Sequence, residues 1–217
     1  MEPLLDRGVH NFMDNLLLAT ETWGEHLILL ADVLERPRQA GLTARPSKCH
    51  LGFWTLDYLG HTRSQGTLSP ERSKVEQLRN DARPTTKTEV WSFLGLSGYY
   101  RRYVVNFSAI AVPLSDLTRK RDPSKVIWTD ACDQAFLALK DRLTSDAVFR
   151  VPDLSKDFVL CTDAYDTGLG AVLLKEHEGA LFPVAYGSRK LSAAEKNYSV
   201  LERECLGVVF GISGFER

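Results

Sequence analysis

The period of the hydrophobic pattern changes at Asp157, and this change restricts the chain to folds that combine helices with an antiparallel sheet. Upstream of it, apolar residues recur at helical spacing, and downstream they form short runs bounded by glycine-containing turns. Runs of this kind predict an antiparallel meander. The predicted strands span residues 158–162, 168–174 and 181–186, with turns at 166–168 and 178–179.

A helix is predicted to follow the meander. Its apolar residues recur at helical spacing and share one face, which we expect to pack on the sheet. Glu204 lies about 80° from the centre of that face, on the border of the expected contact. The stripe consists of Leu201, Cys205, Val208, Val209 and Ile212.

Two carboxylates could meet if this helix packs back on the sheet. Asp163 ends the first predicted strand, and Glu204 lies on the helix. Paired carboxylates can hold Mg²⁺, and two such ions can clamp both oxygens of a phosphodiester displacement. The alternative is a turn-capping Asp and a solvated Glu. Spacing alone favours this alternative, because a two-metal site needs a third or fourth carboxylate.

The N-terminal part begins with an apolar run over residues 9–19 that Asp14 and Asn15 interrupt. Polar residues inside such a run predict a strand, a turn and a second strand. The alternative is a helix whose apolar face is interrupted once by polar residues. Asp14 at a hairpin tip could bind a metal or form an Asx turn, and the pattern favours the turn.

Helices are predicted in the first two thirds of the chain at four places. Residues 24–40 form the first, with Leu27, Leu30, Ala31 and Leu34 on its buried face, and Pro37 is expected to end or kink it. Ser69-Pro70-Glu71 is expected to open a short helix with Ser69 as its N-cap.

Thr85 or Thr86 is expected to cap the next helix, with Glu89 in its first turn. Thr129 or Asp130 is expected to cap a fourth, followed by a polar connection over 145–156. The stripe of the fourth helix comprises Cys132, Ala135 or Phe136, Leu139 and Leu143.

The segment Tyr99-Tyr100-Arg101-Arg102-Tyr103 interleaves aromatic and cationic residues. Such a run can stack on bases and pair with phosphates, or it can place tyrosines in a core with arginines directed outward. The pattern favours the core. Residues 83–121 nevertheless hold seven basic and two acidic residues, while the flanking segments are net acidic. A basic segment can neutralise phosphates, and an Arg-rich solvated surface is the alternative.

Several function classes are excluded. No apolar run reaches the length of a membrane helix, and the richest, 26–34, contains Asp32. The acidic N-terminus does not resemble a signal peptide. Four scattered cysteines favour buried thiols in a reducing compartment, which indicates an intracellular protein, cytoplasmic or nuclear, without a membrane partner. Neither a phosphate-binding Gly-rich loop nor a nucleophile elbow occurs, and five histidines show no metal spacing.

An ordered series of motifs resembles the Pol polyproteins of gypsy-type LTR retrotransposons. The motifs are Ala40-Gly41-Leu42-Thr43, Tyr58-Leu59-Gly60-His61, Arg83-Pro84-Thr85-Thr86, Ser92-Phe93-Leu94-Gly95-Leu96, Tyr99-Tyr100-Arg101-Arg102-Tyr103, Trp128-Thr129-Asp130, Thr162-Asp163-Ala164 and Ser188-Arg189-Lys190-Leu191. The resemblance implies an α/β (α+β) architecture of a palm remnant and helical thumb followed by a partial RNase H-like domain. It implies four segments: palm remnant 1–82, thumb 83–121, connector 122–150 and partial RNase H-like domain 151–217.

The resemblance also implies site residues. Asp163 and Glu204 resemble the first two metal-binding carboxylates of RNase H, which would hold Mg²⁺ or Mn²⁺. Asp14 resembles a catalytic aspartate of the polymerase, and Asn15 stands where a second carboxylate is expected. The remaining carboxylates of both sites would lie outside this chain. By the same resemblance, the phosphate-contacting residues are Lys87, Arg101, Arg102, Arg119, Lys120 and Arg121.

The implied parent activity is RNA-directed DNA synthesis with cleavage of RNA in RNA–DNA hybrids. Because both catalytic sites look incomplete, we expect this chain to be a truncated copy that binds a hybrid or duplex with little or no catalysis. Its partners would include missing Pol segments or a protein at the open sheet edge. The alternative is a host-retained, non-catalytic module that binds nucleic acid or protein.

Overall fold

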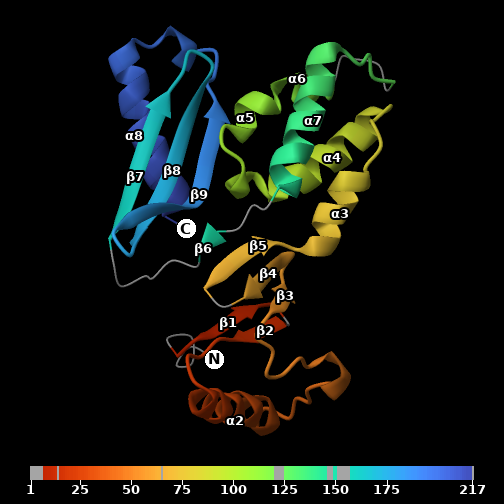
Figure 1. Cartoon of the computed structure of the whole chain (residues 1–217), viewed down its shortest axis with the longest axis vertical. Helices are drawn as coiled ribbons and strands as arrows, with labels where there is room; N and C mark the ends of the chain where they lie inside the picture. Colours follow the sequence, from red (N-terminus) through yellow and green to blue (C-terminus); the bar gives the residue numbers. More distant parts are fainter. Residues whose placement is uncertain are drawn as a thin grey trace. The chain divides into compact units, whose positions relative to one another are not determined.

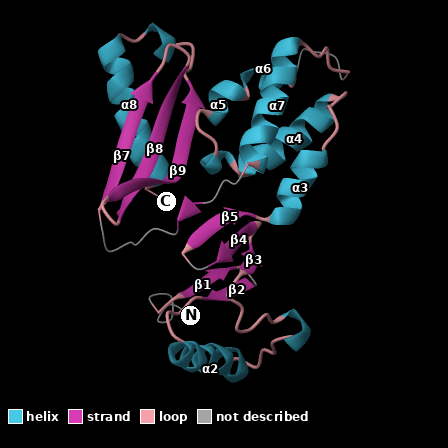
Figure 2. Cartoon of the chain, in the orientation of Figure 1, coloured by secondary structure: helices cyan, strands magenta, loops and turns pink. Residues whose placement is uncertain are grey.

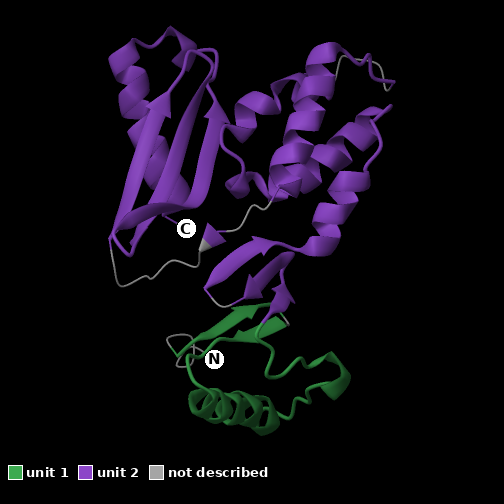
Figure 3. Cartoon of the chain, in the orientation of Figure 1, with its two compact units in different colours: residues 1–54 green, residues 55–217 purple. Residues whose placement is uncertain are grey.

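The computed structural model describes residues 7–13, 15–64, 66–119, 125–145, 149–150 and 157–216. The chain divides into two compact units, residues 1–54 and 55–217 (Figure 3). This division does not coincide with the boundary expected at 82/83. The four segments named above stay predictions.

The first unit consists of a hairpin and a helix. Strands β1 (Val9–Phe12) and β2 (Asn15–Leu18) pair antiparallel, with Phe12 opposite Asn15, which confirms the predicted hairpin. Helix α2 (Trp23–Gln39) begins with a capping box in which Thr22 and Glu25 bond reciprocally. A 3₁₀ turn, η1 (Pro46–Lys48), follows.

The prediction for the buried face of α2 was wrong. Leu29 and Val33 are buried with Val9, whereas Leu27 and Leu34 are exposed. The hairpin contacts the helix along a narrow strip, so it covers only two of the apolar positions. Pro37 lies inside the helix, which continues to Gln39. A proline this close to the C-terminal end removes a single backbone bond, and the helix extends only two residues past it.

The second unit contains a four-stranded sheet in the order β3-β4-β5-β6. Its strands are β3 (Leu56–Tyr58), β4 (His61–Ser64), β5 (Thr67–Pro70) and β6 (Phe149–Arg150). Strand β6 lies within the segment predicted to be a polar connection. Phe149 is buried and stacks on Tyr103, with ring centroids 4.6 Å apart. Burial of this aromatic ring explains why the segment adds a strand.

The predicted cap at Ser69 was also wrong. Ser69 and Pro70 pair with Thr62 and His61 in the ladder between β4 and β5. Helix α3 (Arg72–Asn80) therefore begins later, after Glu71, which makes no capping hydrogen bond. Pairing with β4 holds the two residues in an extended conformation that the helical signal alone did not reveal.

A helical layer follows α3 and encloses the main core (Figure 1). Helix α4 begins at Thr86, one of the two predicted caps, which forms a capping box with Glu89, and α7 begins at Thr129, again one of two predicted caps. Tyr100 and Tyr103 are buried, which confirms the prediction that tyrosines of residues 99–103 belong to the hydrophobic core. The elements of this layer are α4 (Lys87–Tyr99), η2 (Arg101–Tyr103), α5 (Phe107–Ile110), α6 (Val112–Asp116) and α7 (Asp130–Thr144). The buried residues of α7 are those of the predicted stripe: Cys132, Ala135, Phe136, Leu139 and Leu143.

The C-terminal part is the predicted antiparallel meander with a helix on one face (Figure 2). Strands β7 (Phe158–Ala164), β8 (Gly168–His177) and β9 (Ala180–Lys190) are adjacent in chain order. A short turn, η3 (Glu195–Asn197), leads into α8 (Val200–Phe215). The mixed α/β fold agrees with the fold class that the sequence indicated.

The predicted contact face of α8 was wrong. Leu201, Val208, Val209 and Ile212 are exposed, and the buried residues of the helix are Gly207 and Gly211. A Cβ built on Gly211 would lie 2.8 Å from Thr162 Cγ2 in β7. Because glycine has no side chain, the face of α8 that carries Gly207 and Gly211 can approach the sheet most closely. The predicted apolar stripe therefore lies on a side of the helix that does not contact the sheet.

Candidate functional site

Asp163 occupies the penultimate position of β7 and is exposed. It pairs with Gly170 of β8, which pairs with Ser188 of β9. Residues directly opposite in a ladder share one face of the sheet. A Cβ on Gly170 would lie 3.2 Å from Asn106 Oδ1. Asp163 therefore belongs to the face on which the helical layer packs, one residue from the end of the edge strand.

Glu204 lies on α8, which covers the opposite face. Gly207 and Gly211 follow it by three and seven residues, and so lie about 60° and about 20° from it around the helix. A Cβ on Gly207 would be 3.9 Å from the carbonyl oxygen of Asp163. Glu204 therefore shares the sheet-facing side of the helix, one turn nearer the helix start than this contact. The predicted border position arose from the wrong choice of buried face.

The structure thus places both predicted carboxylates at the same end of the meander, on different faces of it. Within the described residues, neither makes a hydrogen bond or ion pair, and no three His, Cys, Asp or Glu side chains come together as metal ligands. The loop at this end is held by an ion pair from Arg203 Nη1 to Asp166 Oδ1, 2.5 Å apart. Two carboxylates in this arrangement do not form a complete Mg²⁺ site.

The polymerase-like residue Asp14 lies outside the described residues. Its neighbour Asn15 begins β2. Met13, before it, has a φ of 54°, in the left-handed region that suits tight turns. The hairpin geometry is present, and the metal role of Asp14 stays a prediction.

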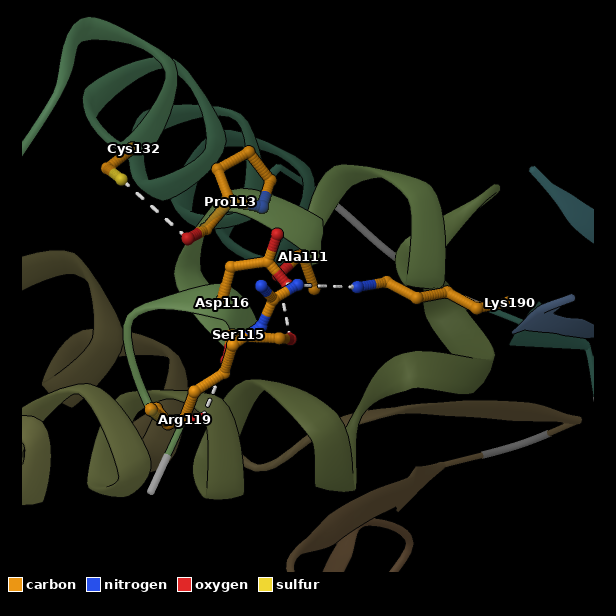
Figure 4. A network of polar contacts seen from close by, with 8 residues as sticks. Ala111, Pro113, Ser115, Asp116, Arg119, Cys132 and Lys190 are labelled. Carbon is orange, nitrogen blue, oxygen red and sulfur yellow. Dashed lines mark hydrogen bonds and ion pairs between the residues drawn. The ribbon is translucent and has the colours of Figure 1, made fainter. Parts of the chain in front are cut away.

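Two cationic side chains meet at the Asp116 carboxylate in the second unit (Figure 4). Arg119 Nη2 lies 3.0 Å and Lys190 Nζ 3.7 Å from Asp116 Oδ1. Lys87 Nζ, from the start of α4, donates to the carbonyl oxygen of Arg119 over 2.5 Å. The Asp116 carboxylate therefore faces one guanidinium and one ammonium group, and Lys87 bonds to the backbone of Arg119. Lys120 and Arg121 continue this segment outside the described residues.

Arg101 and Arg102 differ in their surroundings. Arg101 donates to the carbonyl oxygen of Ser188 in β9, and its guanidinium lies 5.8 Å from the centre of the Phe107 ring. Arg102 is exposed and has no hydrogen bond or ion pair to the part of the chain that the structure describes. The first arginine joins the helical layer to the meander, and the second is open to a ligand.

Ser188 is a residue that sequence reasoning missed. It is 5% exposed and joins the meander to α5. Its hydroxyl accepts from Ser108 N–H over 2.9 Å, and its carbonyl accepts from Ser108 Oγ over 2.7 Å. Serine in a strand carries no local signal of such a role, because the partner lies 80 residues away in the chain.

Two ionisable groups near the strand ends have shifted pKa values. Arg189 and Glu195 pair in two parallel contacts, of 2.8 and 3.0 Å. These bonds, with one from Ser192 N–H, lower the pKa of the Glu195 carboxyl to about 2. Burial raises the pKa of the Tyr100 phenol to about 12, and its hydroxyl donates to the Gly60 carbonyl over 2.6 Å. Both groups are structural.

Residues 128–217 match the family described as the RNase H-like domain found in reverse transcriptase. The chain is 31% identical over 204 residues to the retrovirus-related Pol polyprotein from transposon 412, and 32% identical over 218 residues to that from transposon 297, both of Drosophila melanogaster. It is 32% identical over 199 residues to the transposon Tf2-7 polyprotein of Schizosaccharomyces pombe.

These matches cover 94%, 99% and 91% of this chain but only 16%, 20% and 15% of the polyproteins. The chain thus spans at most a fifth of the length of the curated relatives named here. The chain is therefore similar over nearly its whole length to one part of these polyproteins, and its C-terminal part matches the RNase H-like family.

Solved structures support the fold. The foamy viral protease-reverse transcriptase in complex with double-stranded DNA superimposes with a TM-score of 0.84 at 23% identity, over 98% of this chain and 38% of that one. The same viral protein in complex with an RNA/DNA hybrid gives a TM-score of 0.85, over 98% of this chain and 29% of that one. Among the described helices, none has the length and apolar character needed to cross a membrane.

Proposed function

We propose that this chain binds an RNA–DNA hybrid or a duplex as the thumb, connector and RNase H-like part of a retroelement reverse transcriptase. The observation that carries this proposal is a cationic cluster in which Arg119 and Lys190 meet at Asp116 and Lys87 bonds to the Arg119 carbonyl oxygen. These cationic residues come from separate segments of the chain, which the fold brings together. Intracellular location, cytoplasmic or nuclear, follows from this proposal.

Phosphate contact is the chemistry that such a cluster supports. Lysine and arginine that neutralise phosphates release counterions, so the affinity falls steeply with salt and depends little on sequence. Arg102 is exposed and adds to this surface. Arg101 acts differently in this proposal: it positions the helical layer against β9 through Ser188. Lys120 and Arg121 belong to the same basic segment and are proposed as further phosphate contacts.

A salt titration of hybrid binding tests the proposal. Fluorescence anisotropy with a labelled RNA–DNA hybrid of arbitrary sequence should show a steep fall of affinity with salt. The double reversal Lys87→Glu with Arg119→Glu should weaken binding at least tenfold and flatten the slope by about two units. Lys196→Glu, an exposed cation on η3, serves as the matched control. Equal slopes for all three proteins would refute the proposed surface.

Hydrolysis of the RNA strand is the second candidate function, favoured by the position of Asp163 and Glu204 at one end of the meander. We propose that these are the two carboxylates that this chain contributes to a site for Mg²⁺ or Mn²⁺. Because the described residues supply no third ligand, a working site needs carboxylates from another segment or partner. Polymerase chemistry at Asp14 would require further segments as well. The non-catalytic binding module remains the alternative if neither activity is detected.

A further inference from the structure

A cavity of about 380 Å³ opens into the helical layer, between α6 and the segment that leads into α7. Its volume lies at the lower end of the range in which small-molecule sites occur, about 300–1,000 Å³. Such sites are lined mostly by apolar side chains and carry a few polar groups that orient the ligand. The apolar residues that line this cavity are Pro113, Leu117, Val126 and Ile127. A compact ligand of one or two rings matches this volume.

Hydrogen bonds hold one wall of the cavity, residues 125–127, in place. Val126 N–H donates to the carbonyl oxygen of Thr85 over 3.1 Å, and Thr86 and Lys125 form an isolated antiparallel bridge. These contacts tie the wall to the start of α4, so its position does not depend on contact with α6. The space between the wall and α6 is therefore set by backbone contacts rather than by the rotamer of one side chain.

The buried thiol of Cys132 joins α7 to α6 where both helices line the cavity. Cys132 is 2% exposed, and its Sγ donates to the carbonyl oxygen of Pro113 over 3.7 Å (Figure 4). The same sulfur accepts from the Thr129 hydroxyl over 3.2 Å. Both polar side chains at this end of the cavity therefore use their protons within the protein, and neither presents an unpaired donor to a ligand.

Positive charge exceeds negative charge at the polar side of the cavity. The Asp116 carboxylate that lines it is paired, with Arg119 Nη2 at 3.0 Å and Lys190 Nζ at 3.7 Å. Lys125 lines it as well, and its ammonium group has no ion pair or hydrogen bond to the residues that the structure describes. The two carboxylates in the first turn of α7 are not among the described residues of the lining. Three cations to one carboxylate leave a surplus that an anion would neutralise.

We propose that this cavity binds a small aromatic anion, with its ring on the apolar wall and its anionic group on the Lys125 ammonium. A ring removes water from the aliphatic side chains, and the gain grows with the apolar area that is covered. A rigid ring also loses less conformational freedom on binding than a flexible chain of equal size. The charge-assisted hydrogen bond from Lys125 then orients the anionic group. The inference stands independently of the proposed hybrid binding, in which Lys125 has no role.

Two kinds of molecule share this chemistry. One is an aromatic carboxylate, and the other is a nucleoside monophosphate, whose base supplies the ring and whose phosphate supplies the charge. Because Asp116, Thr129 and Cys132 already have partners, the cavity offers little that could read the edge of a base. Nucleotide binding should therefore differ little between bases, whereas a neutral ring should bind more weakly than the corresponding anion.

Heteronuclear NMR of the full chain tests the proposal, with naphthoate and adenosine monophosphate as the two probes. Naphthoate, adenosine monophosphate or both should shift the backbone amide signals of residues 114–117 and 125–132 at millimolar concentration or below. Naphthamide, the neutral analogue, should bind about threefold more weakly than naphthoate. The probe that binds more tightly identifies the source of the ligand. Shifts confined to other parts of the chain, or no shift with either probe, would overturn the proposal.

Substitutions at the cavity locate the bound anion. Lys125→Gln should weaken naphthoate binding about threefold and leave naphthamide binding unchanged, because it removes only the charge. Ile127→Glu, which puts a negative charge on the exposed part of the apolar wall, should weaken naphthoate binding about tenfold. Lys196→Gln and Leu137→Glu, at an exposed cation and an exposed apolar residue away from the cavity, are the matched controls and should bind as the wild type does. Dispersed amide signals confirm that each variant is folded. Wild-type affinity in both Lys125→Gln and Ile127→Glu would overturn the proposal.

Discussion

A Cβ atom placed on Gly211 of α8 would lie 2.8 Å from Cγ2 of Thr162 in β7, closer than real Cβ contacts come. Helix and strand therefore approach to a separation that only glycine permits at this position. The same contact sets the height of α8 above the sheet, and with it the placement of Glu204 relative to Asp163.

Gly211→Ala is expected to destabilise the protein by about 1–2 kcal/mol. A Cβ there would meet three atoms at 3.2 Å or less, so the overpacking cost should fall in the upper half of about 1–3 kcal/mol, and the gain in helix propensity offsets about 1 kcal/mol of it. Urea denaturation followed by circular dichroism measures the change. Adding Thr162→Ala, which removes the opposing methyl group, should restore part of the loss. Unchanged stability of Gly211→Ala would show that α8 packs less closely than described.

Gly95→Ala is the matched control for that substitution. Gly95 also lies inside a helix, α4, but a Cβ there would have no heavy atom within 4 Å. Only helix propensity changes, so we expect stabilisation by about 0.5–1 kcal/mol. A loss of stability in Gly95→Ala would indicate that the space around an added Cβ atom does not explain how Gly→Ala substitutions change the stability of this protein.

Ser188→Ala should loosen the contact between β9 and α5. The hydroxyl of Ser188 accepts from Ser108 N–H, and its removal leaves a partly buried donor without its partner. We expect a loss of about 1–2 kcal/mol in the free energy of unfolding. Ser145→Ala, which removes an exposed bond to the Arg142 carbonyl, should change it far less. Equal losses of stability in the two variants would argue against Ser188 as the residue that connects β9 to α5.

The Arg189–Glu195 pair should make stability depend on acidity. The pKa of Glu195 is lowered from 4.5 to about 2, so its contribution is full above pH 4.5 and is lost as the pH falls toward 2. Glu195→Gln should be less stable at neutral pH and lose less on acidification through this window. Thermal unfolding of variant and wild type, measured at intervals between neutral pH and pH 2, would show this difference in pH dependence. Parallel curves for variant and wild type would contradict the assignment.

Cleavage of RNA by the isolated chain is expected to be absent. A labelled RNA–DNA hybrid incubated with the protein in Mg²⁺ or Mn²⁺ should remain intact, since two carboxylates on different faces of the sheet do not complete a site. Asp163→Asn should leave hybrid affinity within twofold. Metal-dependent cleavage that this variant loses would instead show that a usable site assembles, with a further ligand supplied by a segment or copy not recognised here.

Local signals in the sequence predicted much of the fold. The candidate caps Thr85 or Thr86 and Thr129 or Asp130 located two helix starts to within one residue, and short apolar runs with glycine turns identified the meander. These succeeded because the interactions involved span a few residues. The ordered motifs likewise resembled Pol polyproteins, and the similarity to the transposon 412, 297 and Tf2-7 polyproteins agrees with that resemblance.

The candidate site was less accessible to sequence reasoning. Asp163 and Glu204 were chosen from spacing and resemblance, but their placement on different faces of the meander follows from strand register and from which side of α8 meets the sheet. The ion pairs at Asp116 join the end of α6 to Lys190 of β9, and these segments are distant in the chain. No local pattern marks such a meeting point.

The sequence by itself determined that α8 is helical, through the spacing of its apolar residues. The structure shows that a capping box of Ser199 and Glu202 begins it. Only the tertiary structure decided which face is buried. Hydrophobic periodicity measures the free energy of removing side chains from water and favours the Leu201–Ile212 side. The meander instead selects the glycine side, because close backbone approach and contact with Thr162 outweigh the burial of a stripe that one sheet of three strands cannot reach.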